Sequence, residues 1–168
     1  MIKYAVTMLL ILLGFALFEA AILSNIFFLP AIPDFLLICV MFFSFNGGKI
    51  AGECAGFLSG LFLDCLSGCP FGLNSLYRLV IGYFAGYFQK TFTLDAIILP
   101  AIICFLATLL KFFLTSVISL FYPNVVNTYR LFSLEFGFEL AMNVILAPPV
   151  FKLLHCFFTK DSGRENIR

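Results

Sequence analysis

Residues 52–78 read GECAGFLSGLFLDCLSGCPFGLNSLYR, and this stretch places glycines and charges at helical spacing within a very apolar chain. Glycines recur at every fourth position before an aspartate, and an arginine begins a second series of the same kind. Residues four apart lie on one face of a helix, so each series predicts a smooth helix face with a charge at one end. The first series is Gly52, Gly56, Gly60 and Asp64, and the second is Arg78, Gly82 and Gly86.

The composition predicts an integral membrane protein. The chain has 168 residues, of which 62% are hydrophobic and 11% are charged, and its formal net charge is +1. Soluble domains are about 25% charged, so this chain has too few polar groups to cover a water-soluble core. At about 20 residues per span, the length allows roughly five or six helices with short loops. The chain lacks alternating ten-residue strands, which argues against a membrane barrel.

The apolar runs and turn residues predict one all-α transmembrane domain over residues 1–168, a bundle of six helices. Pro30 and Pro33 mark one loop, and the Asn-Gly-Gly-Lys sequence at 46–49 marks a turn. A signal peptide is an alternative for the first run, but that run is long and contains Glu19. Basic loop residues gather on the side of the termini, which predicts that both termini are cytoplasmic. The predicted helices cover about residues 4–24, 34–46, 50–66, 74–89, 96–121 and 132–158.

Asp64 and Arg78 are predicted to form an ion pair that locks two neighbouring helices together. The glycine faces allow close approach of two helix backbones, and the short turn between them makes the helices antiparallel neighbours. The two charges then meet at a similar depth. An unpaired charge at the centre of a membrane helix costs at least about 2.5 kcal/mol on insertion scales, so pairing is strongly favoured.

The last predicted helix carries a second polar face. Glu135, Glu139 and Asn143 follow one another at intervals of four residues and therefore share a face. Lys111 lies at a matching depth in the preceding helix, given a rise of about 1.5 Å per residue, and within reach of Glu139. Glu19 and Glu53 are further candidates for buried or interfacial contacts. Structural pairing is the favoured interpretation, and contact with a partner and a transport path are the alternatives.

The sequence contains no pattern typical of an enzyme or a metal site. The single histidine, His155, is far from the other candidate ligands, and no serine or cysteine has a histidine nearby in sequence. Cys65 and Cys69 could form a disulfide if their loop faces an oxidising compartment, but two small residues near an interface are the simpler interpretation. We therefore expect no catalytic residue, cofactor, metal or small-molecule substrate. The basic residues are few and scattered, so nucleic-acid binding is not indicated.

Residues 56–76 resemble the signature of the MreD family of rod shape-determining membrane proteins. Both contain a G-F-x-x-G-x-x-x-D-x-x-S-G-x-x-x-G-x-x-x-L run, and a proline–aspartate pair, Pro33 and Asp34, precedes the second helix. Asn143 followed by LAPP also matches, and the resemblance covers nearly the whole chain. The chain departs from the family in its 24 phenylalanines and its lack of tryptophan. The positions of the run are Gly56, Phe57, Gly60, Asp64, Ser67, Gly68, Gly72 and Leu76.

The resemblance implies a non-enzymatic scaffold of the bacterial elongation machinery in the cytoplasmic membrane. Such proteins bind the bitopic protein MreC, and through it they are linked to MreB filaments, the RodA glycosyltransferase and a class B penicillin-binding transpeptidase. That network directs lateral peptidoglycan synthesis and keeps cells rod-shaped.

The main alternative is the substrate-binding subunit of an energy-coupling-factor vitamin transporter, which has a similar six-helix fold. Ala16 and Ala20 satisfy the alanine spacing of that subunit's partner-binding face. The outer turn after the third predicted helix is tight, however, and leaves little room for a vitamin pocket. A small self-assembling channel is a third interpretation, supported only by the polar face.

Overall fold

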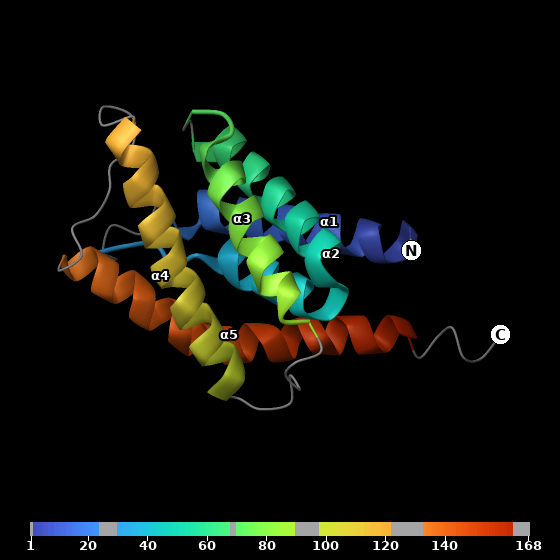
Figure 1. The fold of residues 1–168 in the computed structure, drawn as a ribbon. Coiled ribbons are helices and arrows are strands. Elements are labelled where there is room, and N and C mark those ends of the chain that lie inside the picture. The colour runs from blue at the N-terminus through green and yellow to red at the C-terminus, as the bar shows by residue number, and fades with distance from the viewer. Residues whose placement is uncertain (1, 24–29, 68–69, 90–97, 122–132, 163–168) are drawn as a thin grey trace.

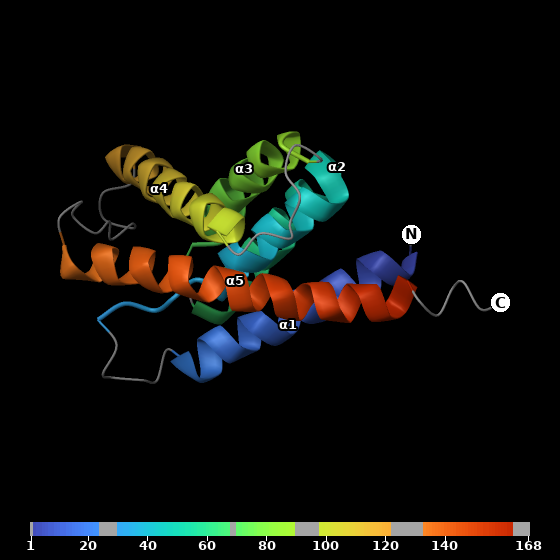
Figure 2. The same cartoon turned by 90° about the horizontal axis from the view of Figure 1, so that it is seen from below.

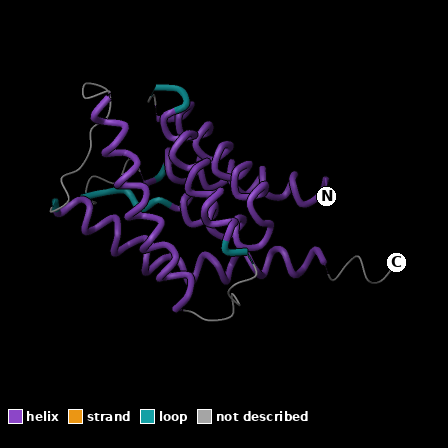
Figure 3. The backbone as a smooth tube through the Cα atoms, viewed as in Figure 1, coloured by secondary structure: helices purple, strands orange, loops and turns teal. Residues whose placement is uncertain are grey.

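The chain folds as an all-helical bundle in the computed structural model, which describes residues 2–23, 30–67, 70–89, 98–121 and 133–162 (Figures 1 and 3). The first part of the second helix lies at the centre, and the other helices pack around it. The helices are α1 (Ile2–Ala21), α2 (Phe35–Ser67), α3 (Leu73–Tyr87), α4 (Ile98–Phe121) and α5 (Leu134–Ser162).

The second helix is broken at Gly48, whose backbone has φ 81° and ψ −167°. Glycine adopts this conformation without the steric penalty that a Cβ atom would bring. The break divides α2 into segments 35–47 and 49–67, which correspond to the helices predicted at 34–46 and 50–66. The predicted count of six helices is therefore not confirmed, because the expected turn is a break inside one of the five helices that the described residues form.

The other four predicted helices coincide with α1, α3, α4 and α5 to within about one turn at each end. The start of α1 and the end of α5 lie on the same side of the bundle in both views (Figures 1 and 2). At 15 residues, α3 is shorter than the roughly 20 residues of a typical span. Four helices of the described chain are long and apolar enough to cross a membrane: Lys3–Ala21, Phe35–Ser67, Ile98–Phe121 and Leu134–Phe157.

The first segment of α2 forms the core of the bundle. Residues 36–45 are all buried, and almost all of them are apolar, which is typical of a helix that is surrounded by others. The ring of Phe42 makes edge contacts with Phe43 and with Phe151 of α5, at centroid distances of 5.6 and 5.5 Å. Helices α1, α3, α4 and α5 all contact α2. The position of α2 therefore fixes where every other helix lies.

The two glycine faces bring the backbones of α2 and α3 into direct contact. A Cβ atom added at Gly52 would overlap the carbonyl oxygen of Gly82, and one added at Gly82 would overlap that of Gly52. A Cβ atom at Gly56 would overlap the backbone of Arg78 in the same way. This is the close antiparallel approach that the sequence predicted. Further along the same interface, Gly60 meets the backbone of Ser75, and Gly86 meets that of Lys49.

Candidate functional site: a buried ionic cluster

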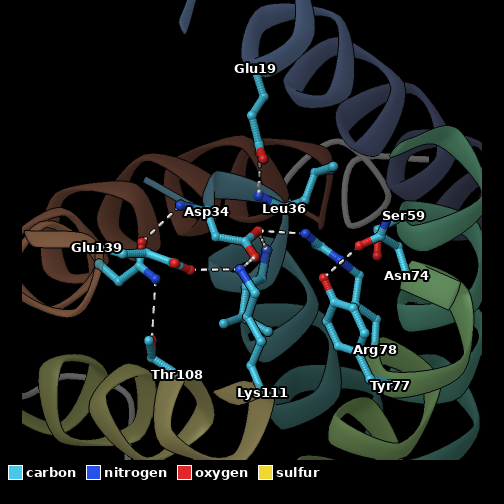
Figure 4. A network of polar contacts seen from close by, with 12 residues as sticks. Glu19, Asp34, Leu36, Ser59, Asn74, Tyr77, Arg78, Thr108, Lys111 and Glu139 are labelled. Atoms are coloured by element: carbon cyan, nitrogen blue, oxygen red, sulfur yellow. Dashed lines mark hydrogen bonds and ion pairs between the residues drawn. The ribbon is translucent and has the colours of Figure 1, made fainter. Parts of the chain in front are cut away.

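Asp34 lies at the centre of the bundle, at the N-terminus of α2 (Figure 4). Its Oδ1 atom accepts a hydrogen bond of 2.8 Å from the backbone N–H of Leu37, which is the contact that an N-cap residue makes. Glu19 of α1 reaches the same helix end, where its Oε2 atom accepts a 3.4 Å hydrogen bond from the N–H of Leu36. Two carboxylates therefore meet the positive end of the α2 dipole.

Two cations from different helices neutralise Asp34. The Nη2 atom of Arg78 in α3 lies 2.7 Å from Oδ1, and the Nζ atom of Lys111 in α4 lies 2.7 Å from Oδ2. The same Nζ atom lies 2.6 Å from Oε1 of Glu139 in α5. Removing one partner from a buried ion pair costs about 3–5 kcal/mol. These ion pairs therefore connect the N-terminus of α2 with α3, α4 and α5.

Asn143 of α5 links this charge chain to α4. Its Oδ1 atom accepts a 2.8 Å hydrogen bond from the backbone N–H of Asp34, and its Nδ2 atom donates to Oγ1 of Thr108 at 3.2 Å. The amide is fully buried, and both ends of it are bonded. We refer to the connected side chains as the ionic cluster, which consists of Asp34, Arg78, Lys111, Glu139 and Asn143.

The prediction of an ion pair between Asp64 and Arg78 is wrong, because Arg78 pairs with Asp34. Asp64 instead accepts hydrogen bonds from the backbone N–H groups of Gly72 at 2.9 Å and Asn74 at 3.1 Å, and from Nδ2 of Asn74 at 2.8 Å. The first N–H groups of a helix have no acceptor within the helix. The carboxylate satisfies them at the start of α3, while the arginine turns toward the bundle centre.

The other predicted polar contact is present, since Lys111 and Glu139 form an ion pair. Glu135, which was expected to share the polar face, is exposed in the first turn of α5 and takes no part in the cluster. The sequence placed Asp34 in the proline–aspartate pair before the second predicted helix and missed its role as the centre of the cluster. A proline–aspartate pair directly before an apolar run is typical of a helix N-cap, which Asp34 is, but that pattern gives no sign of the two cations that bind it.

Two residues of the run that resembles the MreD signature, Ser67 and Gly72, lie at the junction of α2 and α3. Ser67 is exposed, and its hydroxyl donates to the carbonyl of Leu63 at 2.6 Å. Gly72 has φ 96° and precedes the first residue of α3, so its left-handed backbone suits glycine. Gly68 and Cys69 lie outside the described residues, so the predicted alternatives for the Cys65–Cys69 pair stay open.

The ionic cluster joins groups of opposite charge from different helices. Within the described residues, both cations bind carboxylates of neighbouring helices. In that part of the chain, no three histidine, cysteine, aspartate or glutamate side chains are placed to hold a metal ion together. The contacts observed in the cluster therefore connect helices to one another, and Glu19 extends the connection to α1.

Residues 1–157 match the family described as rod shape-determining protein MreD. The chain belongs to the MreD family. It is accordingly a multi-pass membrane protein with a role in determining rod shape. Neither the curated proteins nor the solved structures contain a match. The glycine interface and the ionic cluster both lie within the region that matches MreD.

Membership of the MreD family gives no support to the vitamin-transporter alternative. Ala16, the first residue of the predicted alanine face, is fully buried on the side of α1 that packs against the bundle. Ala20 is half-buried. In this MreD protein Ala16 therefore serves internal packing, and the alanine pair does not form an exposed face.

Proposed function

We propose that this MreD protein is a non-enzymatic scaffold of the cell-elongation machinery, which binds MreC in the cytoplasmic membrane and helps direct lateral peptidoglycan synthesis. Through MreC it would be linked to MreB, RodA and a class B penicillin-binding transpeptidase. The family match supports the role in rod shape. The observation that carries the proposal is the ionic cluster, which uses the charged groups of the bundle interior to tie helices together.

A scaffold requires a surface that keeps its shape when a partner binds. Membrane helices are not driven together by the hydrophobic effect, so close packing and polar contacts must fix their arrangement. Here the backbone contact of α2 and α3 provides the packing. The ionic cluster adds a polar contact to α4 and α5, and Glu19 adds one to α1.

The outer surface of the bundle suits partner binding within the membrane. Large apolar side chains are exposed on α1, α4 and α5, for example Leu10 at 62%, Phe113 at 62% and Ile145 at 65%. Those faces contact lipid or the membrane-spanning segments of other proteins. A partner with a single span, such as MreC, can be bound on one of them.

The proposal is tested by complementation in a rod-shaped bacterium that lacks its own MreD. The tagged chain is expressed together with the MreC protein of its own source, and cell shape and co-purification of MreC are measured. Restored rods and retention of MreC are expected. Round cells that contain normal amounts of the membrane-inserted chain, with no MreC retained, would contradict the proposal.

A further inference from the structure

The guanidinium group of Arg78 has unused hydrogen-bond donors at the centre of the bundle. Arg78 is fully buried, and it is the largest such side chain among the described residues. A guanidinium group has five N–H donors. Its Nη2 atom donates to Oδ1 of Asp34 at 2.7 Å, but neither Nε nor Nη1 has a hydrogen-bond partner in the described part of the chain. Buried polar groups are almost always hydrogen-bonded, and a charged donor left without an acceptor is especially costly. These N–H groups therefore require an acceptor.

Glu19 of α1 has unused acceptor sites near the same guanidinium. The residue is only 7% exposed, and its Oε2 atom accepts one long hydrogen bond of 3.4 Å from the N–H of Leu36. A carboxylate offers about four lone-pair sites. The charges of Glu19 and Arg78 are near enough to interact, but the two groups form no direct ion pair among the described contacts. Donors and acceptors of opposite charge thus lie near each other without meeting.

The fold holds Glu19 and Arg78 apart on different sides of the start of α2. Helices α1 and α3 both pack against α2, but among the described helices they do not pack against each other. Glu19 points toward the N–H of Leu36, and Arg78 points toward Asp34 (Figure 4). The ring of Tyr77 lies beside the guanidinium, with 5.7 Å between Cζ of Arg78 and the ring centroid. A small ligand that binds both charged side chains would therefore be close to Tyr77.

The chemistry of the two groups selects the ligand. It must accept hydrogen bonds from a guanidinium and donate one to a carboxylate. A metal cation cannot accept a hydrogen bond. An anion such as chloride cannot donate one, and it would add to an excess of negative charge, because Glu19, Asp34 and Glu139 already face only two cations, Arg78 and Lys111. Water does both, and buried waters typically make about three hydrogen bonds to polar groups that would otherwise lack partners.

We propose that water bound between the carboxylate of Glu19 and the Nε and Nη1 groups of Arg78 links α1 to α3 inside the bundle. Bulk water is absent from the hydrocarbon core of a membrane, so ordered water is one of the few ways to satisfy polar groups there. The site extends the ionic cluster to α1 by a contact stronger than the long hydrogen bond to Leu36. It does not depend on the binding of MreC.

X-ray radiolytic footprinting of the full chain in lipid nanodiscs tests for this water. The beam converts bound water into hydroxyl radicals, which oxidise the side chains beside it even where bulk solvent does not reach. Phe42 is the matched control for Tyr77, because both are 2% exposed, and Phe42 packs among the rings of Phe43 and Phe151. Tyr77 is expected to be oxidised several times faster than Phe42. Oxidation of Tyr77 at the rate of Phe42 would overturn the proposal.

Two substitutions of Glu19 test its part in the site. Both remove the negative charge, but Glu19→Gln keeps groups that hydrogen-bond to water, whereas Glu19→Leu has none. Oxidation of Tyr77 is expected to persist in Glu19→Gln and to fall severalfold in Glu19→Leu, while oxidation of Phe42 stays low in both. Equal oxidation of Tyr77 in the two variants would show that Glu19 does not hold the water. The measurement on the unmodified chain decides the proposal even if a variant fails to fold, and neither result bears on whether the chain binds MreC.

Discussion

Substituting Asp34 by asparagine is expected to cause the largest loss of stability of any single charge removal in this protein. Asparagine has almost the same size and keeps an oxygen for the N–H of Leu37. It removes the charge that lies 2.7 Å from both Arg78 and Lys111. Lys111 keeps Glu139, but Nη2 of Arg78 loses its carboxylate, and Nε and Nη1 already have no hydrogen-bond acceptor in the described part of the chain. Leaving one buried charge unpaired costs about 3–5 kcal/mol.

The loss can be measured as the free energy of unfolding in mixed micelles titrated with sodium dodecyl sulfate. Glu135→Gln is the matched control, because it also removes one carboxylate but at an exposed position, where a change within about 0.5 kcal/mol is expected. A decrease for Asp34→Asn that does not exceed the decrease for Glu135→Gln would refute the reasoning.

A double-mutant cycle tests whether the loss comes from Arg78. The variant Asp34→Asn with Arg78→Met no longer contains the unpaired guanidinium, so it is expected to unfold less readily than Asp34→Asn alone. Residues that share a polar network show interaction energies of about 0.5–3 kcal/mol. Strict additivity of the two single losses would show that the guanidinium and the carboxylate do not depend on each other.

Three further substitutions probe the glycine interface, the start of α3 and the edge of the cluster. Gly82→Leu is expected to lower the free energy of unfolding by about 3 kcal/mol, because the leucine side chain would overlap the backbone of α2. Gly14→Leu, at a glycine with open space around it, is the control. Equal losses of free energy in the two variants would contradict the packing of α2 against α3. Asp64→Ala is expected to speed hydrogen exchange in the first turn of α3, with a loss of about 1–2 kcal/mol; unchanged exchange there would refute the capping role. Glu139→Gln is expected to cost less than Asp34→Asn in the same micelle titration, because among the described residues Glu139 forms one ion pair, with Lys111, whereas Asp34 forms two; a larger loss for Glu139→Gln would contradict this.

The sequence predicted the glycine interface well because its signal is local. Small residues at intervals of four define one helix face without reference to the rest of the fold, and the turn after Asp64 is short enough to make the two helices neighbours. The contact of Gly52 with Gly82 follows from these two facts. The same holds for the helix ranges, which are set by apolar runs and turn residues.

The partner of Arg78 could not be predicted in this way. Depth along a helix limits which charges can meet, but the predicted helices place Asp34 and Asp64 at helix ends on the same side of the membrane. The choice between them depends on where the N-terminus of α2 lies, and that is fixed by packing around residues 36–45. Unpaired N–H groups at the start of α3 also compete for Asp64, and sequence spacing gives no measure of that competition.

Lys111 links the stability of the bundle to the proposed binding of MreC, since its ammonium group holds α4 against the start of α2 and against α5. Asp34→Asn removes one of its two carboxylates, so the ammonium is expected to shift and MreC retention per inserted molecule to fall. Asp64→Ala destabilises the start of α3 without touching Lys111, and is expected to leave that ratio unchanged. Co-purification normalised to the amount of folded chain separates a general loss of stability from a change at the surface. Equal retention by the two variants would show that the cluster holds the bundle together but does not set the shape of the surface that MreC contacts.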